Sequence, residues 1–81
     1  MDDKTNLFKL SDLQGKNIGS ILDEVYKALE DRGYNPTDQM VGYLLSGDLG
    51  YISNYSNARK KIKHIDRAKI IEYLLNEVMH K

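Results

Sequence analysis

The chain has no cysteine, two histidines and a single proline among its 81 residues. Without cysteine it can form neither a disulfide scaffold, nor a thiolate nucleophile, nor a cysteine-based zinc site. His64 and His80 are too few for a histidine-rich metal centre, and their spacing matches no metal-binding pattern. We therefore expect no metal and no cofactor.

Long hydrophobic runs are also missing, since none approaches the roughly 20 residues that a membrane-spanning helix needs. The first residues include Asp2, Asp3 and Lys4 and lack the basic start and apolar core of a signal peptide. We therefore expect a cytoplasmic protein without membrane insertion. Neighbouring carboxylates such as Asp23 and Glu24 point to different sides of a helix, so no acid–base pair is indicated and we expect a protein that is not an enzyme.

Charge is balanced overall, with 12 basic and 12 acidic side chains, but it is unevenly distributed along the chain. Residues 17–52 carry six acidic and two basic side chains, whereas residues 53–81 carry seven basic and three acidic ones. These parts can pair within one chain or across a dimer, or the basic part can face an acidic partner. A chain of this length also has only a marginal core, and we therefore expect a homodimer that joins apolar helix faces.

Apolar residues recur at i, i+3, i+4, i+7 and i+11 between residues 18 and 29, which predicts a first helix. We expect Asn17 to cap this helix, Asp31 and Arg32 to end it, and Gly33 to take the left-handed conformation that follows many helices. The apolar side chains are Ile18, Ile21, Leu22, Val25 and Leu29.

Three further helices are predicted. Asn35 as N-cap and Pro36 at the first helical position begin the second, which Ser46 and Gly47 end. A short third helix is expected over residues 56–65, and a last one, capped by Asp66, over residues 67–79. The expected apolar side chains are Met40, Val41, Leu44 and Leu45, then Ala58, Ile62 and Ile65, then Ile70, Ile71, Leu74, Leu75 and Val78.

Residues 1–16 show no sustained apolar period and no helix cap. We expect a flexible N-terminal arm over residues 1–16 and a helical domain over residues 17–81. No alternating run flanks a hairpin turn, so strands are not expected. The predicted fold class is all-α, a small bundle of about four helices with a flexible arm, assembled as a homodimer.

The glycine-rich segment, residues 33–52, holds four of the six glycines, the only proline and three of the six tyrosines. This density predicts two tight turns around a short apolar helix, a shaped structural wall. The segment has no cysteine, histidine or lysine, so it is not a catalytic loop. We expect Gly42 to allow a close approach, Asp48 to cap the next turn, and Tyr51 and Ile52 to point inward. The structural residues expected here are Gly33, Pro36, Gly42, Tyr43, Gly47, Asp48 and Tyr51.

The run Val-Gly-Tyr-Leu-Leu-Ser-Gly-Asp at residues 41–48, with Tyr-Asn-Pro at 34–36 and Asn-Ala-Arg at 57–59, resembles the IreB/ReoM family of small bacterial regulatory phosphoproteins. The likeness extends from about Ile21 to Leu75. The family pattern has a proline after the Ser-Gly-Asp triplet, where this chain has Leu49. That difference concerns the geometry of the turn and leaves the expected fold unchanged.

The resemblance implies a function that composition does not show. Relatives are phosphorylated by a membrane-bound, eukaryote-like Ser/Thr kinase on a threonine that matches Thr5, in a similar Asp-x-Thr context ahead of a phenylalanine. Some relatives have a second threonine upstream, which this chain lacks. The resemblance implies a non-enzymatic cytoplasmic regulator that controls cell-wall (peptidoglycan) precursor synthesis through Clp-protease-dependent turnover of an enolpyruvyl transferase. Its partners would be the kinase, components of the Clp pathway and a second copy of itself.

A basic cluster at residues 59–67 is either a solvated helix face or a docking surface for an acidic partner or the phosphorylated arm. Relatives carry arginine-rich versions of this stretch. Arg59 and Arg67 match, whereas Lys63 and His64 replace arginines and lose the bidentate fork. We expect these four residues to bind a partner. The alternative is a small nucleic-acid-binding module that uses this basic part, against which stand a long connecting turn and a net charge of zero.

Overall fold

The computed structural model describes the backbone of residues 3–80 and the side chains of residues 17–80. Within this part the chain forms four α-helices, two short 3-10 helices and no strands, which confirms the all-α prediction. The elements are α1 (Asp3–Asp31), α2 (Pro36–Ser46), η1 (Leu49–Tyr51), η2 (Tyr55–Asn57), α3 (Ala58–Lys63) and α4 (Arg67–Met79). None of the helices in this part combines the length and the apolar run that a bilayer crossing requires.

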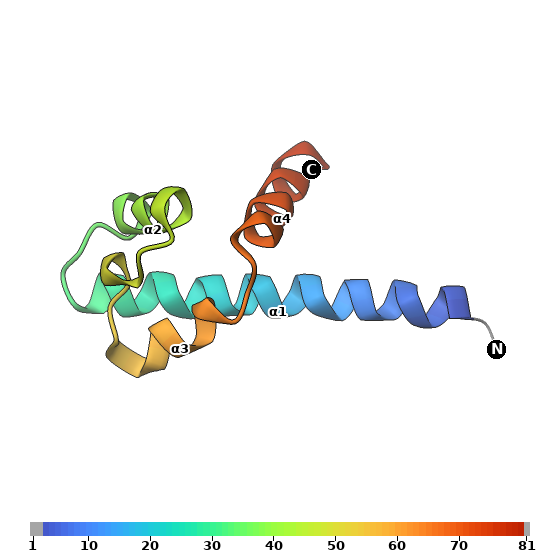
Figure 1. The fold of residues 1–81 in the computed structure, drawn as a ribbon, viewed down its shortest axis with the longest axis horizontal. Coiled ribbons are helices and arrows are strands. Elements are labelled where there is room, and N and C mark those ends of the chain that lie inside the picture. Colours follow the sequence, from blue (N-terminus) through green and yellow to red (C-terminus); the bar gives the residue numbers. More distant parts are fainter. Residues whose placement is uncertain (1–2, 81) are drawn as a thin grey trace.

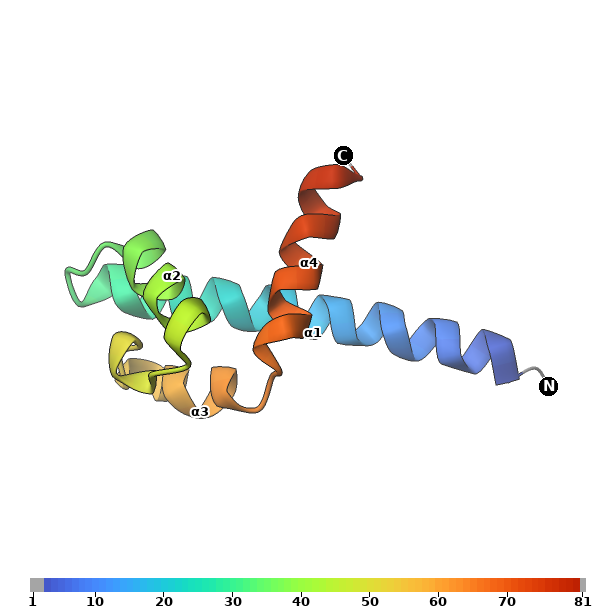
Figure 2. The same ribbon diagram turned by 45° about the horizontal axis from the view of Figure 1, so that its top comes forward.

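Helix α1 is the axis on which the other elements are placed (Figure 1). Helices α2 and α3 lie along the part of α1 that ends near Asp31. Helix α4 crosses α1 near its middle and rises away from it, as the turned view in Figure 2 also shows. Much of the surface of α4 therefore has no neighbour among the described residues.

The start of α1 differs from the prediction, because the helix begins at Asp3 and passes through Asn17. The expected N-cap at Asn17 was therefore wrong. Asparagine favours caps but costs less than about 0.7 kcal/mol inside a helix, and no proline interrupts residues 3–31. The predicted arm, residues 1–16, lies outside the described side chains, so its flexibility and the division into arm and domain stay predictions.

Nine buried apolar residues form the core, to which α1, α2, α3, α4 and the connection between η1 and η2 all contribute. The apolar period of α1 is confirmed, since Leu22, Val25 and Leu29 are buried while Ile18 and Ile21 are half-buried against them. Ile52 is fully buried, as predicted. The buried set is Leu22, Val25, Ala28, Leu29, Tyr43, Ile52, Ala58, Ile62 and Ile70.

The apolar face predicted for α2 was partly wrong. Tyr43, which is 4% exposed, is the α2 residue that enters the core, whereas Val41 and Leu45 are 49% and 82% exposed. Helix α2 packs on two sides, since Tyr43 faces the core and Gly42 faces the ring of Tyr51. This rotation turns Val41 and Leu45 toward the outside.

The apolar face predicted for α4 is buried only at Ile70, because α4 rises away from the body. Ile71, Leu74, Leu75 and Val78 all remain exposed. The sequence period identified the helix but not which side has a neighbour.

The predicted helix ends are confirmed at most positions. Asn35 Oδ1 accepts a hydrogen bond from the Asp38 amide at 3.2 Å, and Asp66 Oδ1 accepts one from the Ala68 amide at 3.0 Å. Gly33 and Gly47 have φ of 84° and 76°, the left-handed conformation expected after a helix. Local sequence therefore sets where α2 and α4 begin and where α1 and α2 end.

The third helix is shorter than predicted, since α3 covers Ala58–Lys63 rather than residues 56–65. Ser56 and Asn57 have φ of 55° and 60°, so the right-handed helix cannot begin before Ala58. Left-handed backbone costs about 1–2 kcal/mol for a residue other than glycine, although less for asparagine. The predicted burial of Ala58 and Ile62 is confirmed, and Ile65 is half-buried.

Candidate functional site

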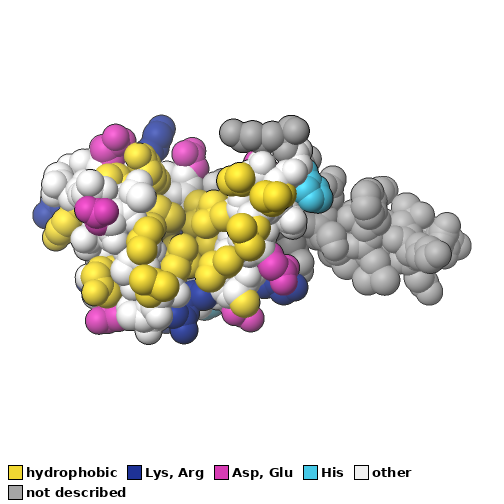
Figure 3. Space-filling model, turned by 90° about the horizontal axis from the view of Figure 1, so that it is seen from above, with side chains coloured by type: hydrophobic (Ala, Val, Ile, Leu, Met, Phe, Trp, Pro, Cys, Tyr) yellow, Lys and Arg dark blue, Asp and Glu magenta, His cyan; other side chains and the backbone are white. Residues whose placement is uncertain are grey.

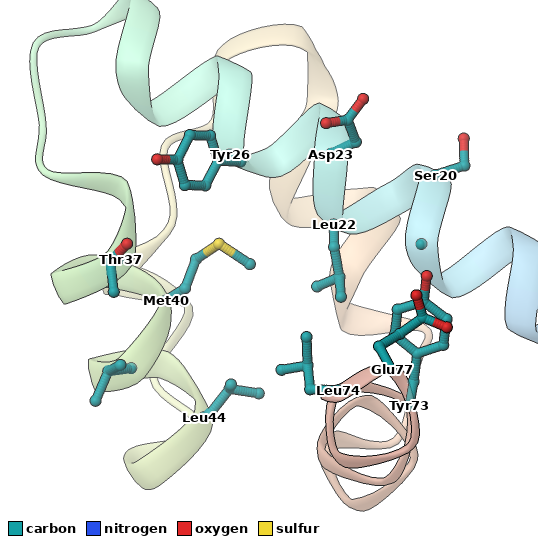
Figure 4. Close-up of a pocket in the computed structure, with 12 residues that line it drawn as sticks. Ser20, Leu22, Asp23, Tyr26, Thr37, Met40, Leu44, Tyr73, Leu74 and Glu77 are labelled. Atoms are coloured by element: carbon teal, nitrogen blue, oxygen red, sulfur yellow. The ribbon is translucent and has the colours of Figure 1, made fainter. Parts of the chain in front are cut away.

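A groove of about 700 Å³ lies between α1, α2 and α4 (Figure 4). We call it the α1–α2–α4 groove. Leu22 of α1, Leu44 of α2 and Leu74 of α4 point toward its centre, and Met40 covers its α2 side. These four apolar side chains come from three helices, so the groove exists only in the folded protein.

The polar residues of the groove lie around this apolar centre. Ser20 and Tyr26 of α1 and Thr37 of α2 provide hydroxyl groups. Among the described lining residues, only Asp23 and Glu77 are charged, and both are acidic. They belong to different helices, α1 and α4, and in Figure 4 the Asp23 carboxylate points away from the centre, so its negative charge lies at the rim of the groove.

The position of α4 on α1 depends on a close contact between Gly19 and Tyr73. A Cβ atom at Gly19 would collide with the Tyr73 hydroxyl group and lie 3.1 Å from its Cζ atom. Any side chain at residue 19 would thus require the Tyr73 ring to move. Sequence reasoning missed this contact, for which the available signal was a glycine inside a helical apolar period.

The glycine-rich segment packs η1 against α2, which agrees with the structural role predicted for it. A Cβ atom at Gly42 would lie 2.5 Å from Cε1 of Tyr51, so the close approach predicted at Gly42 is present. Gln39 Nε2 donates a hydrogen bond to the carbonyl oxygen of Tyr51 at 3.0 Å. Asp48 Oδ1 accepts from the Gly50 amide at 2.8 Å, which confirms the predicted cap. Tyr51 itself is 40% exposed, so the prediction that it points inward was only partly right.

The basic residues predicted to bind a partner have different surroundings. Arg59 Nε donates to the carbonyl oxygens of Leu49 at 3.1 Å and Ile52 at 2.7 Å. Arg67 Nη1 donates to the carbonyl oxygen of Leu44 at 3.0 Å. Both guanidinium groups thus stabilise the backbone that follows or ends α2, with fewer donors left for a partner.

Lys63 and His64 are exposed at the end of α3. Lys61 beside them forms an ion pair with Glu24 of α1. Binding of a partner to Arg59, Lys63, His64 and Arg67 stays a prediction, and Thr5 lies outside the described side chains. Among the described residues, no three His, Cys, Asp or Glu side chains are grouped as metal ligands would be.

Apolar side chains gather on the face that bears α2 and α4 (Figure 3). The α2 part includes Val41 and Leu45, and the α4 part includes Ile71, Leu75 and Val78. Apolar patches of this kind on a small protein often mark interaction sites. The surface of the described part is therefore suited to binding other macromolecules.

The family model described as IreB regulatory phosphoprotein matches residues 3–80. The match includes the whole α1–α2–α4 groove, the glycine-rich segment, the basic cluster and the position of Thr5. It extends beyond the residues 21–75 in which the sequence resemblance was visible, and it confirms that resemblance. The chain belongs to the IreB family of regulatory phosphoproteins.

Proposed function

We propose that this protein is a non-enzymatic cytoplasmic regulator that a eukaryote-like Ser/Thr kinase switches by phosphorylating Thr5. In this proposal it controls peptidoglycan precursor synthesis through Clp-protease-dependent turnover of an enolpyruvyl transferase. The observation that carries the proposal is the family match over residues 3–80, which includes Thr5 in its Asp-x-Thr context. The groove and the exposed apolar side chains of the described part support a role through binding.

The switch would act through charge. A phosphate adds about −1.5 to −2 charges at neutral pH and can accept hydrogen bonds from basic side chains. Lys63 and His64 are exposed and offer one such face, and a partner can offer another. A charge-assisted contact of about 1.5–3 kcal/mol changes an affinity by more than tenfold, without refolding of the helical domain.

The test compares wild type, Thr5→Ala and Thr5→Ser after incubation with the kinase. We expect wild type and Thr5→Ser to gain one phosphate and Thr5→Ala to gain none, as intact-protein mass measures. Pull-down from lysate with phosphorylated and unmodified protein, read by mass spectrometry, should then recover Clp-pathway components in different amounts. Equal recovery in both states, or phosphate on Thr5→Ala, would refute the switch.

We also propose that the protein is a homodimer joined through the outer face of α4. Ile71, Leu75 and Val78 are 43%, 57% and 64% exposed and follow one another at i, i+4 and i+7, the spacing of a helix–helix seam. None of the three lines the α1–α2–α4 groove. Sedimentation equilibrium at micromolar concentration should give twice the chain mass for wild type and one chain mass for Leu75→Asn. A wild-type mass of 9.3 kDa would contradict the proposal.

A further inference from the structure

We propose that the α1–α2–α4 groove binds an amphipathic helix of a partner protein, one that carries basic side chains on both sides of its apolar stripe. The partner is defined by this chemistry. Binding in the groove does not involve Thr5 or the outer face of α4, so the inference stands apart from the switch and the homodimer proposed above.

The apolar part of the groove fits the stripe of a helix. Leu22, Leu44 and Leu74 converge at its centre from three helices, and Val41 extends the α2 side with 49% of its surface exposed. A small molecule would cover only the centre of the groove. A bound helix carries apolar side chains at i, i+3, i+4 and i+7, and these can contact the groove along its whole length.

The charges of the groove select a basic helix. Among the described residues that line the groove, only Asp23 on α1 and Glu77 on α4 are charged, and no basic side chain balances them. A helix with lysines or arginines beside its apolar stripe would bring opposite charge to both carboxylates.

The α4 helix of a second copy fits this groove less well. It would bring Glu72 and Glu77 toward the acidic side chains of the groove, and its Lys69 is already 3.6 Å from its own Glu72. Like charges brought together in this way disfavour a wrong partner. A basic helix from another protein is therefore the better match in charge.

The walls of the groove are held in place before any partner binds. The Gly19–Tyr73 contact fixes α4 against α1, and the hydrogen bond from Arg67 to the carbonyl oxygen of Leu44 fixes the start of α4 against the end of α2. A helix entering the groove would therefore meet a preformed surface, so less conformational entropy is lost on binding. These contacts make the groove a more suitable docking site than the freely exposed faces.

The experiment uses two fluorescein-labelled 14-residue helical peptides, with leucines at i, i+3, i+4, i+7 and i+11. One carries lysines at the flanking positions and the other carries glutamates there. Fluorescence anisotropy with the full chain should show binding of the lysine peptide and at least about tenfold weaker binding of the glutamate peptide, with the difference falling as salt is added.

Matched variants locate the binding. Val41→Asn, in the lining, should weaken binding of the lysine peptide about tenfold, whereas Leu45→Asn, one turn away and outside it, should leave it unchanged. The double variant Asp23→Asn/Glu77→Gln should weaken binding about threefold to tenfold. Its control, Glu30→Gln/Glu72→Gln, makes the same change in net charge at exposed positions outside the lining and should have no effect.

Three results would overturn the inference. The first is equal binding of the lysine and glutamate peptides. The second is equal weakening by a lining variant and its control, because binding would then be nonspecific. The third is a wild-type dimer that Val41→Asn converts to monomer in sedimentation, because a second copy would then occupy the groove. A failed Thr5 switch would alter none of these readings.

Discussion

The contact between Gly42 and Tyr51 gives a prediction that the structure makes quantitative. In Gly42→Ala, the new Cβ atom would lie 2.5, 2.6 and 2.9 Å from Cε1, Cδ1 and Cζ of Tyr51. The ring must therefore move by roughly 1 Å to regain an ordinary carbon–carbon separation of about 3.5–4.0 Å. Overpacking of this kind costs about 1–3 kcal/mol.

Alanine also has an advantage over glycine inside a helix, worth about 1 kcal/mol. The two effects oppose each other, so Gly42→Ala should destabilise the protein by about 0–2 kcal/mol in the wild-type background. In a Tyr51→Ala background the ring is gone, and the same substitution should stabilise the protein by about 1 kcal/mol. The hydrogen bond from Gln39 to the backbone oxygen of residue 51 is unaffected by either change.

A double-mutant cycle measures the contact directly. Wild type, Gly42→Ala, Tyr51→Ala and the double variant are unfolded with urea at one protein concentration, and the free energies of unfolding are compared. We expect a coupling of about 1–3 kcal/mol between the two residues. A coupling below about 0.3 kcal/mol, with Gly42→Ala changing stability equally in both backgrounds, would show that α2 and η1 are not in close contact.

Substitutions at four further positions test the helix ends. Gly33→Ala and Gly47→Ala should each cost about 1–2 kcal/mol for their left-handed backbone. Gly47→Ala should cost more, because its Cβ would lie 2.8 Å from the Arg67 guanidinium carbon, whereas residue 33 has open space; equal melting temperatures for the two variants would contradict this. Asp66→Ala should lower the free energy of unfolding, measured in urea, by about 1 kcal/mol, because Oδ1 of Asp66 caps α4. Asp66→Asn should keep most of this stabilisation, because asparagine also has an Oδ1 atom that can accept the hydrogen bond. Asn57→Gly should raise stability by about 0.5–1 kcal/mol, since Asn57 has φ of 60° and no side-chain cap bond, and a lower melting temperature would show that its left-handed backbone is not strained.

The features that the sequence predicted well are those that neighbouring residues determine. Asn35 followed by Pro36 and the single Asp66 were enough to locate the starts of α2 and α4. Gly33 and Gly47 marked the ends of α1 and α2, because the left-handed conformation strongly favours glycine. Capping and φ depend on a few adjacent residues, so no knowledge of tertiary structure was needed.

What the sequence could not predict depends on how the helices are placed relative to one another. Periodicity marked Ile71, Leu74 and Leu75 as apolar, but the direction of α4 decides that they stay exposed. The α1–α2–α4 groove includes the contact of Gly19 with Tyr73, two residues 54 positions apart whose pairing no local pattern reveals.

The arginines show the same limit. As sequence, Arg59 and Arg67 looked like part of a free basic face, whereas both donate hydrogen bonds to backbone carbonyl groups. A positive charge in a run of basic residues does not reveal that its guanidinium group completes a turn. Only the fold brings the carbonyl groups of Leu44 and Ile52 within reach.

The Arg67 contact has a consequence for how the protein opens locally. Arg67 is the first residue of α4, and its side chain bonds the last turn of α2, beside Gly47. If the end of α2 unravels, the carbonyl group of Leu44 moves and α4 loses one of its few attachments to the body. The amides of these two helix ends should then exchange with deuterium as one cooperative unit, even though more than 20 residues separate Leu44 from Arg67 along the chain.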